Sequence, residues 1–200
     1  MRRAVEILLA AMTAVWWSIG CDNPFATREP EPPVQNQSSW IQPTSPTYAL
    51  INLKNAVAEK NISNYLRCLA DTGVSSRSFS FVADAAAMNA NPGLFQRWGK
   101  EAEANYLNQL SLYLPKDSTA SVTFERLKET TFQDSVILLQ TYELKLAYKC
   151  SSKDCPRSWR GQAEFRFIRT EDEVWYIYKW IDYATGDDLT WSSLKAAFGK

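Results

Sequence analysis

The chain contains no histidine, so its candidate reactive groups are carboxylates, tyrosines and cysteines. Without an imidazole there is no Ser-His-Asp or Cys-His arrangement, no HExxH zinc site and no imidazole proton shuttle. The sequence also lacks GxGxxG, P-loop and EF-hand patterns. The acid pair Glu101/Glu103 and the run Glu171–Glu173 have the spacing of helix-start and turn charges. We therefore expect no metal site and no cofactor.

Residues 1–20 have the pattern of an export signal. Arg2 and Arg3 precede an apolar run that begins at Ile7, and Ser18-Ile19-Gly20-Cys21 resembles a bacterial lipobox. The apolar run is shorter than the ~20 residues that a membrane-spanning helix needs. This favours a lipoprotein over an uncut anchor or a simple secretory signal. The resemblance implies that Cys21 is acylated and holds the protein to a bilayer in the bacterial cell envelope, on its periplasmic or extracytoplasmic side.

Two cysteines, Cys150 and Cys155, bracket a four-residue stretch between two predicted strands. They could form a metal or redox pair, or a disulfide at the tip of a hairpin. Export to an oxidising compartment favours the disulfide. Cys68 then has no evident partner, and we expect it to pack as a small buried apolar residue.

Composition and proline content predict how the chain is divided. Basic and acidic residues number 22 each, so no nucleic-acid partner is expected. The Pro-rich residues 21–44 have no apolar periodicity and are predicted to form a tether, in which only Trp40-Ile41 is suited to docking on the domain. Residues 45–200 are predicted to form one α+β domain.

Apolar periodicity and capping residues predict the elements of that domain. Helices are expected at 46–59, 62–69, 98–114 and 191–198, with Ser45 and Thr190 as N-caps. Strands are expected at 79–82, 120–128, 135–150, 159–169 and 174–183, the last two forming an antiparallel hairpin. The stretch 85–93 carries no clear signal. In the last strand, strict alternation would place Tyr178, Trp180 and Asp182 on one face.

The order of these elements resembles that of nuclear-transport-factor-2-like (SnoaL-like) domains. The resemblance rests on the helix pair with Tyr65-Leu66-x-x-Leu69-x-Asp71, on the Phe-rich first strand, and on the closing Trp175-x-Ile177-x-x-Trp180-x-Asp182. It implies a cone: a strongly curved antiparallel sheet wrapped around N-terminal helices, with a short C-terminal helix and an apolar pocket at one end. It also implies an outer sheet face on which many relatives form homodimers.

Some members of this superfamily are isomerases, dehydratases or cyclases that use an Asp general base opposed by a Tyr or a second acid. The resemblance makes Asp182 the first candidate base, Asp84 the second, and Tyr178 a candidate hydrogen-bond donor. Alternatively, Asp182 ends a strand and binds a turn or a helix N-terminus. The candidate pocket residues are Tyr48, Tyr106, Tyr142, Tyr176, Tyr178, Trp180 and Asp182.

The sequence therefore favours a non-catalytic binding module, which would take a small apolar ligand or an envelope protein partner. The alternative is a pocket isomerase or hydratase that uses an Asp base. A third interpretation is an envelope scaffold without a ligand, for which a filled cone would be evidence.

Overall fold

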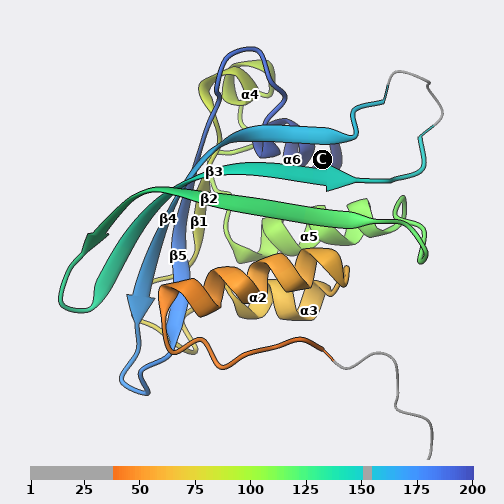
Figure 1. Ribbon diagram of the computed structural model, residues 1–200. Coiled ribbons are helices and arrows are strands. Elements are labelled where there is room, and N and C mark those ends of the chain that lie inside the picture. The colour runs from red at the N-terminus through yellow and green to blue at the C-terminus, as the bar shows by residue number, and fades with distance from the viewer. Residues whose placement is uncertain (1–37, 151–154) are drawn as a thin grey trace, which may run out of the picture. The chain divides into compact units, whose positions relative to one another are not determined.

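The computed structural model describes residues 38–150 and 155–200, which belong to one compact unit (Figure 1). Its helices are α2 (Pro46–Ala58), α3 (Ile62–Arg67), α4 (Ala85–Ala90), α5 (Lys100–Ser111) and α6 (Trp191–Phe198). Its strands are β1 (Ser80–Val82), β2 (Ala120–Thr131), β3 (Ser135–Leu146), β4 (Ser158–Arg169) and β5 (Trp175–Tyr183). The α+β fold is as predicted, and α4 adds a short helix in the stretch that carried no clear signal.

Local capping sets the start of several helices. The Ser45 side chain accepts a hydrogen bond from the backbone of Tyr48, and Pro46 occupies the first turn of α2. Thr190 caps α6 in the same way through the backbone N–H of Ser193. Helix α2 ends where Lys60 adopts a positive φ of 54°, and α3 follows at once with Asn61 as its N-cap. The two predicted N-caps are confirmed.

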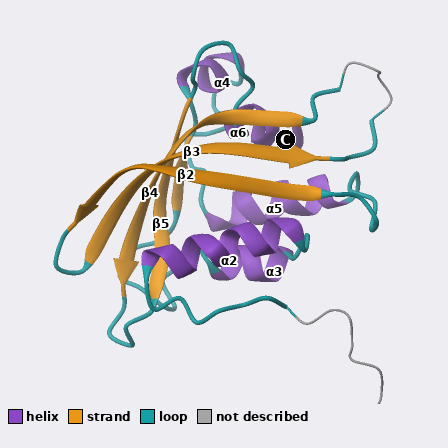
Figure 2. Ribbon diagram, viewed as in Figure 1, coloured by secondary structure: helices purple, strands orange, loops and turns teal. Residues whose placement is uncertain are grey.

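The five strands form one sheet in the order β1-β5-β4-β3-β2. The four long strands are antiparallel to their neighbours, as predicted, whereas the three-residue β1 runs parallel to β5. Figure 2 shows this curved sheet with α2, α3 and α5 covering one side. Irregular pairing in β2 near Arg126 and in β5 near Tyr178 accompanies the curvature.

The core lies between the helices and the inner face of the sheet. Ala163, Phe165 and Phe167 of β4 are fully buried there, as the alternation in the sequence predicts. The largest buried side chains are aromatic and come from five elements: Tyr65, Tyr106, Phe165, Phe167, Trp180 and Trp191. They make the space under the sheet a packed interior.

The segment from Ser38 to Thr44 runs along the helices. Asn52 of α2 holds the backbone of Ile41 at both its N–H and its C=O. Trp40 packs on the core beneath the guanidinium of Arg67, 3.9 Å from the ring centroid. Within the described ranges, none of the helices combines the length and the apolar character needed to cross a bilayer.

Candidate functional site

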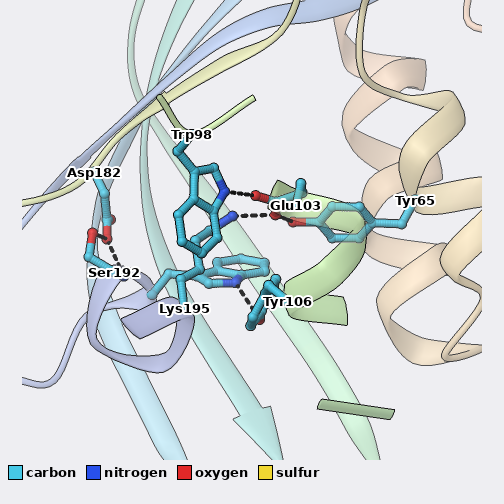
Figure 3. Close-up of polar contacts among 8 residues, drawn as sticks. Tyr65, Trp98, Glu103, Tyr106, Asp182, Ser192 and Lys195 are labelled. Atoms are coloured by element: carbon cyan, nitrogen blue, oxygen red, sulfur yellow. Dashed lines mark hydrogen bonds and ion pairs between the residues drawn. The ribbon is translucent and has the colours of Figure 1, made fainter. Parts of the chain in front are cut away.

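Two charged side chains meet inside the core. Glu103 comes from α5 and Lys195 from α6, and neither has any exposed surface. The Lys195 ammonium pairs with Glu103 Oε1, and Tyr65 Oη donates to the same oxygen over 2.8 Å. Trp98 Nε1 donates to Glu103 Oε2 over 2.6 Å (Figure 3). Glu103 therefore joins α5 to α3, to α6 and to the loop that precedes α5.

Aromatic rings surround the Lys195 ammonium. Its Nζ lies 4.2 Å from the centroid of Phe81, 4.6 Å from Trp180, 5.1 Å from Tyr106 and 5.7 Å from Trp98. These are distances at which ring quadrupoles attract a cation. Burial lowers the pKa of Lys195, and the charge of Glu103 opposes that shift. The chain has thus placed a cation of its own inside an aromatic cage.

A second polar cluster lies where β5 ends and α6 begins. Asp182 Oδ1 accepts a hydrogen bond from Tyr142 Oη over 2.8 Å. Asp182 Oδ2 accepts from the backbone N–H of Ser192 over 2.7 Å and from its hydroxyl over 2.5 Å. Burial raises the pKa of Asp182 to about 6, although these donors act in the opposite direction. Asp182 therefore binds the first turn of α6, as the alternative interpretation expected.

Asp84 belongs to the same cluster and is also a cap. Its Oδ1 accepts from the backbone N–H of Ala87 over 2.9 Å at the start of α4. Its Oδ2 accepts from Thr190 Oγ1, the N-cap of α6, over 2.5 Å. Both predicted acids are buried and hydrogen-bonded to helix N-termini, where a negative charge is stabilised.

A close backbone approach makes the Tyr142 contact feasible. Gly161 on β4 pairs directly with Tyr142 on β3. A Cβ at Gly161 would lie 2.8 Å from Tyr142 Oη and 2.6 Å from the carbonyl oxygen of Tyr183. Only a glycine here leaves room for the tyrosine side chain to lie over β4 and bind Asp182 and the N–H of Trp191.

The structure divides the predicted pocket residues into three groups. Tyr106, Tyr142, Trp180 and Asp182 are buried in the core. Tyr176 and Tyr178 are half-buried, and Arg77 lies over the Tyr178 ring at 4.7 Å. Tyr48 is exposed on α2.

The expected alternation in β5 is wrong. Arg166 pairs with Lys179, but the next residue, Phe167, pairs with Ile177, so Tyr178 is an extra residue in β5. This bulge puts the fully buried Ile177 and Trp180 on the same side. Tyr178 consequently does not share a face with Trp180 and Asp182, because the strand is not regular there.

Sequence reasoning missed the central pair. Glu103 was expected to be a helix-start charge, but it is completely buried, and Lys195 was not identified as a site residue. One signal was available: Glu103, Tyr106 and Leu110 follow one helical stripe, as do Trp191 and Lys195. A charge on an apolar stripe indicates a buried partner.

Three of the cysteines lie in the described part of the chain. Cys150 and Cys155 are joined by the predicted disulfide. Cys68 is free and buried, as expected, and burial raises the pKa of its thiol to about 12. Cys21 lies outside the described residues. Within the described part of the chain, no group of three or more acidic or cysteine side chains is arranged to hold a metal ion.

The surface carries shallow hollows outside the core. One, of about 440 Å³, lies over β2, β3 and β4 and is bordered by Thr141, Glu143 and Arg160. Another, of about 390 Å³, lies beside β1 and is bordered by Met88, Phe95 and Arg97. The interior clusters described above do not line either hollow, apart from Tyr142 in the first and Phe81 and Trp98 in the second.

No protein-family model matches the sequence, and the search of curated proteins found no match. Solved structures do match. A conserved protein from Planctomyces limnophilus is similar with a TM-score of 0.53 and 12% identity, over 70% of this chain and 92% of that one. A putative aromatic ring hydroxylase from Novosphingobium aromaticivorans has a TM-score of 0.51 and 14% identity, over 68% and 84%.

A nuclear transport factor 2-like superfamily protein from Salmonella enterica is similar with a TM-score of 0.50 and 10% identity, over 70% of this chain and 89% of that one. At these identities the likeness concerns the fold alone. The domain has the nuclear-transport-factor-2-like fold that its element order predicted.

Proposed function

We propose that this chain is a lipid-anchored protein of the bacterial cell envelope, whose nuclear-transport-factor-2-like domain is a non-catalytic interaction module. The anchor is inferred from the sequence, in which Ser18-Ile19-Gly20-Cys21 follows an apolar run. Acylation of Cys21 would keep the domain at a membrane surface.

The proposal that the domain is non-catalytic rests on the side chains that fill the interior of the cone. Trp191 and Lys195 of α6 occupy the interior together with Glu103, and all three are buried. A small-molecule site needs a cavity with polar groups that are free to orient a ligand. Here the polar atoms of Glu103 and Asp182 already bind donors of the chain itself.

The outer face of the sheet is the surface that we propose for partner binding, with a second copy of the chain as the partner. In its middle row, Leu139, Glu164 and Ile181 lie side by side on β3, β4 and β5, and all three are half-buried. Glu164 forms an ion pair with Arg166 of the next row over 2.7 Å. A two-fold interface brings a patch against itself, and a patch with aliphatic residues and both signs of charge is self-complementary.

An isomerase or hydratase is the second candidate, because of one observation. The Asp182 pKa of about 6 lies in the range useful for a general base, and a tyrosine hydroxyl is within 2.8 Å. However, both carboxylate oxygens of Asp182 already accept hydrogen bonds from the chain, and the residue is buried. Catalysis would require α6 to move away from Asp182.

The test is native mass spectrometry of the full chain, expressed in a bacterium and extracted from membranes in mild detergent. We expect a dimer of chains that begin at Cys21, carry acyl groups and retain no small molecule. Cys21→Ala should remain uncut and unacylated. An unmodified parent chain would contradict the anchor, and a retained stoichiometric ligand would contradict the interaction module.

A charge reversal tests the proposed interface. Arg166→Glu places like charges in the patch and should convert the dimer to a monomer. Lys54→Glu on the exposed side of α2 is the matched control and should leave the dimer intact. A dimer that survives Arg166→Glu unchanged would rule out this face.

A further inference from the structure

One end of the domain combines exposed apolar side chains with several cations. It lies beyond the C-terminal end of α5, where Leu112 and Tyr113 follow the helix. Leu112 is 72% exposed and Tyr113 is 46% exposed. Leu112 and Tyr113 thus form an exposed apolar pair at the end of α5.

Hydrogen bonds and ring contacts join this end to three other parts of the chain. The backbone N–H of Lys149, beyond β3, donates to the carbonyl of Tyr113 over 2.6 Å. The Tyr113 ring lies 5.4 Å from Phe198 at the end of α6. Arg157, just before β4, donates to the carbonyl of Tyr148 over 2.5 Å. These elements therefore meet on one surface, which we call the α5 end.

The charged side chains of the α5 end are mainly basic. Lys116, Lys149 and Arg157 are exposed, and Lys60 binds the carbonyls of Pro115 and Lys116 over 2.7 Å each. Among the described residues, Asp117 and Glu59 are nearby acids, and Glu59 accepts a hydrogen bond from the backbone of Ser39. Cations around exposed Leu and Tyr side chains are the composition of surfaces that bind anionic lipid bilayers.

The described chain starts at this same end. Ser38 and Ser39 bind Asn64 and Glu59, next to Lys60, which reaches Pro115 and Lys116. Figure 1 shows this segment (orange) running along α2 and α3 toward the side on which α5 ends. The stretch between Cys21 and Ser38 can span at most about 60 Å, because each residue adds no more than ~3.6 Å. A chain anchored at Cys21 would therefore join the domain beside the α5 end.

We propose that the α5 end is a membrane-docking face, which binds the surface of an anionic bilayer through Leu112 and Tyr113 with Lys116, Lys149 and Arg157 around them. Its orientation toward the membrane rests on the proposed anchoring at Cys21.

The test measures the depth of a fluorophore on the full acylated chain, reconstituted in vesicles. Leu112→Cys is labelled with an environment-sensitive dye, since Cys68 is buried and Cys150 and Cys155 form a disulfide. In vesicles of phosphatidylcholine with phosphatidylglycerol, lipid-borne quenchers should reduce its emission about twofold or more, because docked side chains reach ~5–10 Å into the boundary region.

The matched label position is Phe132→Cys, in the exposed turn after β2. The 12-residue strand β2 separates this turn from the α5 end by roughly 36 Å, given ~3.3 Å per residue. Emission from position 132 should not be quenched. Equal quenching at both positions, or none at 112, would overturn the proposal.

Charge variants test the electrostatic part. Lys116→Gln with Lys149→Gln should weaken docking about 25-fold, since each cation near an anionic surface contributes about fivefold. The matched pair Lys128→Gln with Arg97→Gln removes two exposed cations elsewhere and should leave quenching at position 112 unchanged. Disulfide-linked dimers of the unlabelled Leu112→Cys variant would show that a second copy covers this face, which would also overturn the proposal.

Failure of the docking face and failure of the anchor are distinguishable. The intact mass of the reconstituted chain reports acylation at Cys21 independently of the label. An acylated chain without quenching contradicts docking alone. If the chain carries no acyl group, the labelled protein is added to the same vesicles from solution, and quenching at position 112 remains the criterion for the docking face.

Discussion

Two buried carboxylates in this domain are stabilised in different ways. Glu103 lies against the ammonium of Lys195, with Tyr65 and Trp98 as further donors. Asp182 binds Tyr142 and the first turn of α6, and within the residues that the structure describes it forms no ion pair. Burial without a cation is why the pKa of Asp182 rises to about 6.

The two carboxylates show that the free-energy cost of burying a charge depends on whether its partner is a cation or a neutral donor. A paired charge such as that of Glu103 is stable as long as both partners remain, but removing one partner leaves the other charge buried and unpaired. A charge that only neutral donors stabilise can be removed by protonation, so its cost depends on pH. The core should therefore be sensitive to mutation around Glu103 and to pH around Asp182.

Removing the cation should have the largest effect. Lys195→Met leaves the carboxyl group of Glu103 buried without its cation, which should lower the free energy of unfolding by about 3–5 kcal/mol. Urea unfolding followed by tryptophan fluorescence measures the loss. The double variant Lys195→Met/Glu103→Gln should recover most of it, because no unpaired charge remains. A single variant that costs less than about 1 kcal/mol would contradict the role of the pair.

Asp182 should make stability depend on pH. Its pKa is raised from 3.8 to about 6 in the folded state, so the folded state binds a proton more tightly than the unfolded state does. The stability that the protonation of Asp182 contributes is fully present below its ordinary pKa and is lost as the pH rises through about 6. We expect up to about 3 kcal/mol of difference in unfolding free energy.

The measurement compares parent and Asp182→Asn by urea unfolding at several pH values. The variant should lose the gain in stability on acidification. Asp71→Asn is an informative control, because a hydrogen bond from Lys100 lowers the pKa of Asp71. The stability that the Asp71 carboxylate contributes is therefore lost on acidification. Identical pH profiles of the parent and Asp182→Asn would show that Asp182 keeps an ordinary pKa.

Gly161→Ala should disturb the contacts of Asp182 and leave those of Glu103 unchanged. The added methyl group would lie 2.8 Å from Tyr142 Oη and 2.6 Å from the Tyr183 carbonyl oxygen. Displacing Tyr142 should cost about 1–3 kcal/mol, as overpacking usually does. Thermal unfolding measures it. Because Tyr142→Phe alters the same hydroxyl, its effect and that of Gly161→Ala should not add. Additive effects would mean that Tyr142 had not moved.

An exposed ion pair should have the smallest effect. Arg160 lies 2.5 Å from Glu143 on the outer face, with about half of its side chain exposed. Hydrogen bonds from Lys145 and Arg160 lower the pKa of Glu143. Because solvent and salt screen such pairs, Arg160→Ala should cost less than about 1 kcal/mol. A double-mutant cycle with Glu143→Gln, at low and high salt, measures the coupling between the two side chains. If Arg160→Ala lowered the free energy of unfolding as much as Lys195→Met, the expected difference between exposed and buried ion pairs would be wrong.

Local features of the fold could be predicted because their causes lie within a few residues. Ser45 and Thr190 cap helices through N–H groups three positions later, which a sequence displays directly. The hairpin of β4 and β5 follows from two strand-forming runs separated by a short turn. The order of these elements was sufficient to predict the nuclear-transport-factor-2-like fold.

The arrangement of the interior could not be predicted in this way. The extra residue at Tyr178 shifts one half of β5, and an alternating pattern carries no mark of such a bulge. Tyr178 and Asp182 were consequently placed on one face, although the structure separates them. The two acids named as candidate bases are both buried, but no local pattern shows that the three donors to Asp182 come from β3 and α6.

The helix caps, the hairpin and the α+β class could be predicted from the sequence, which also favoured the pairing of Cys150 with Cys155, since each depends largely on residues close together along the chain. The contact between Glu103 and Lys195, 92 positions apart, depends on the folded structure. Whether a charged residue faces water or a partner depends on which elements pack against it. That packing follows from the curvature of the whole sheet, and no short stretch of sequence contains it.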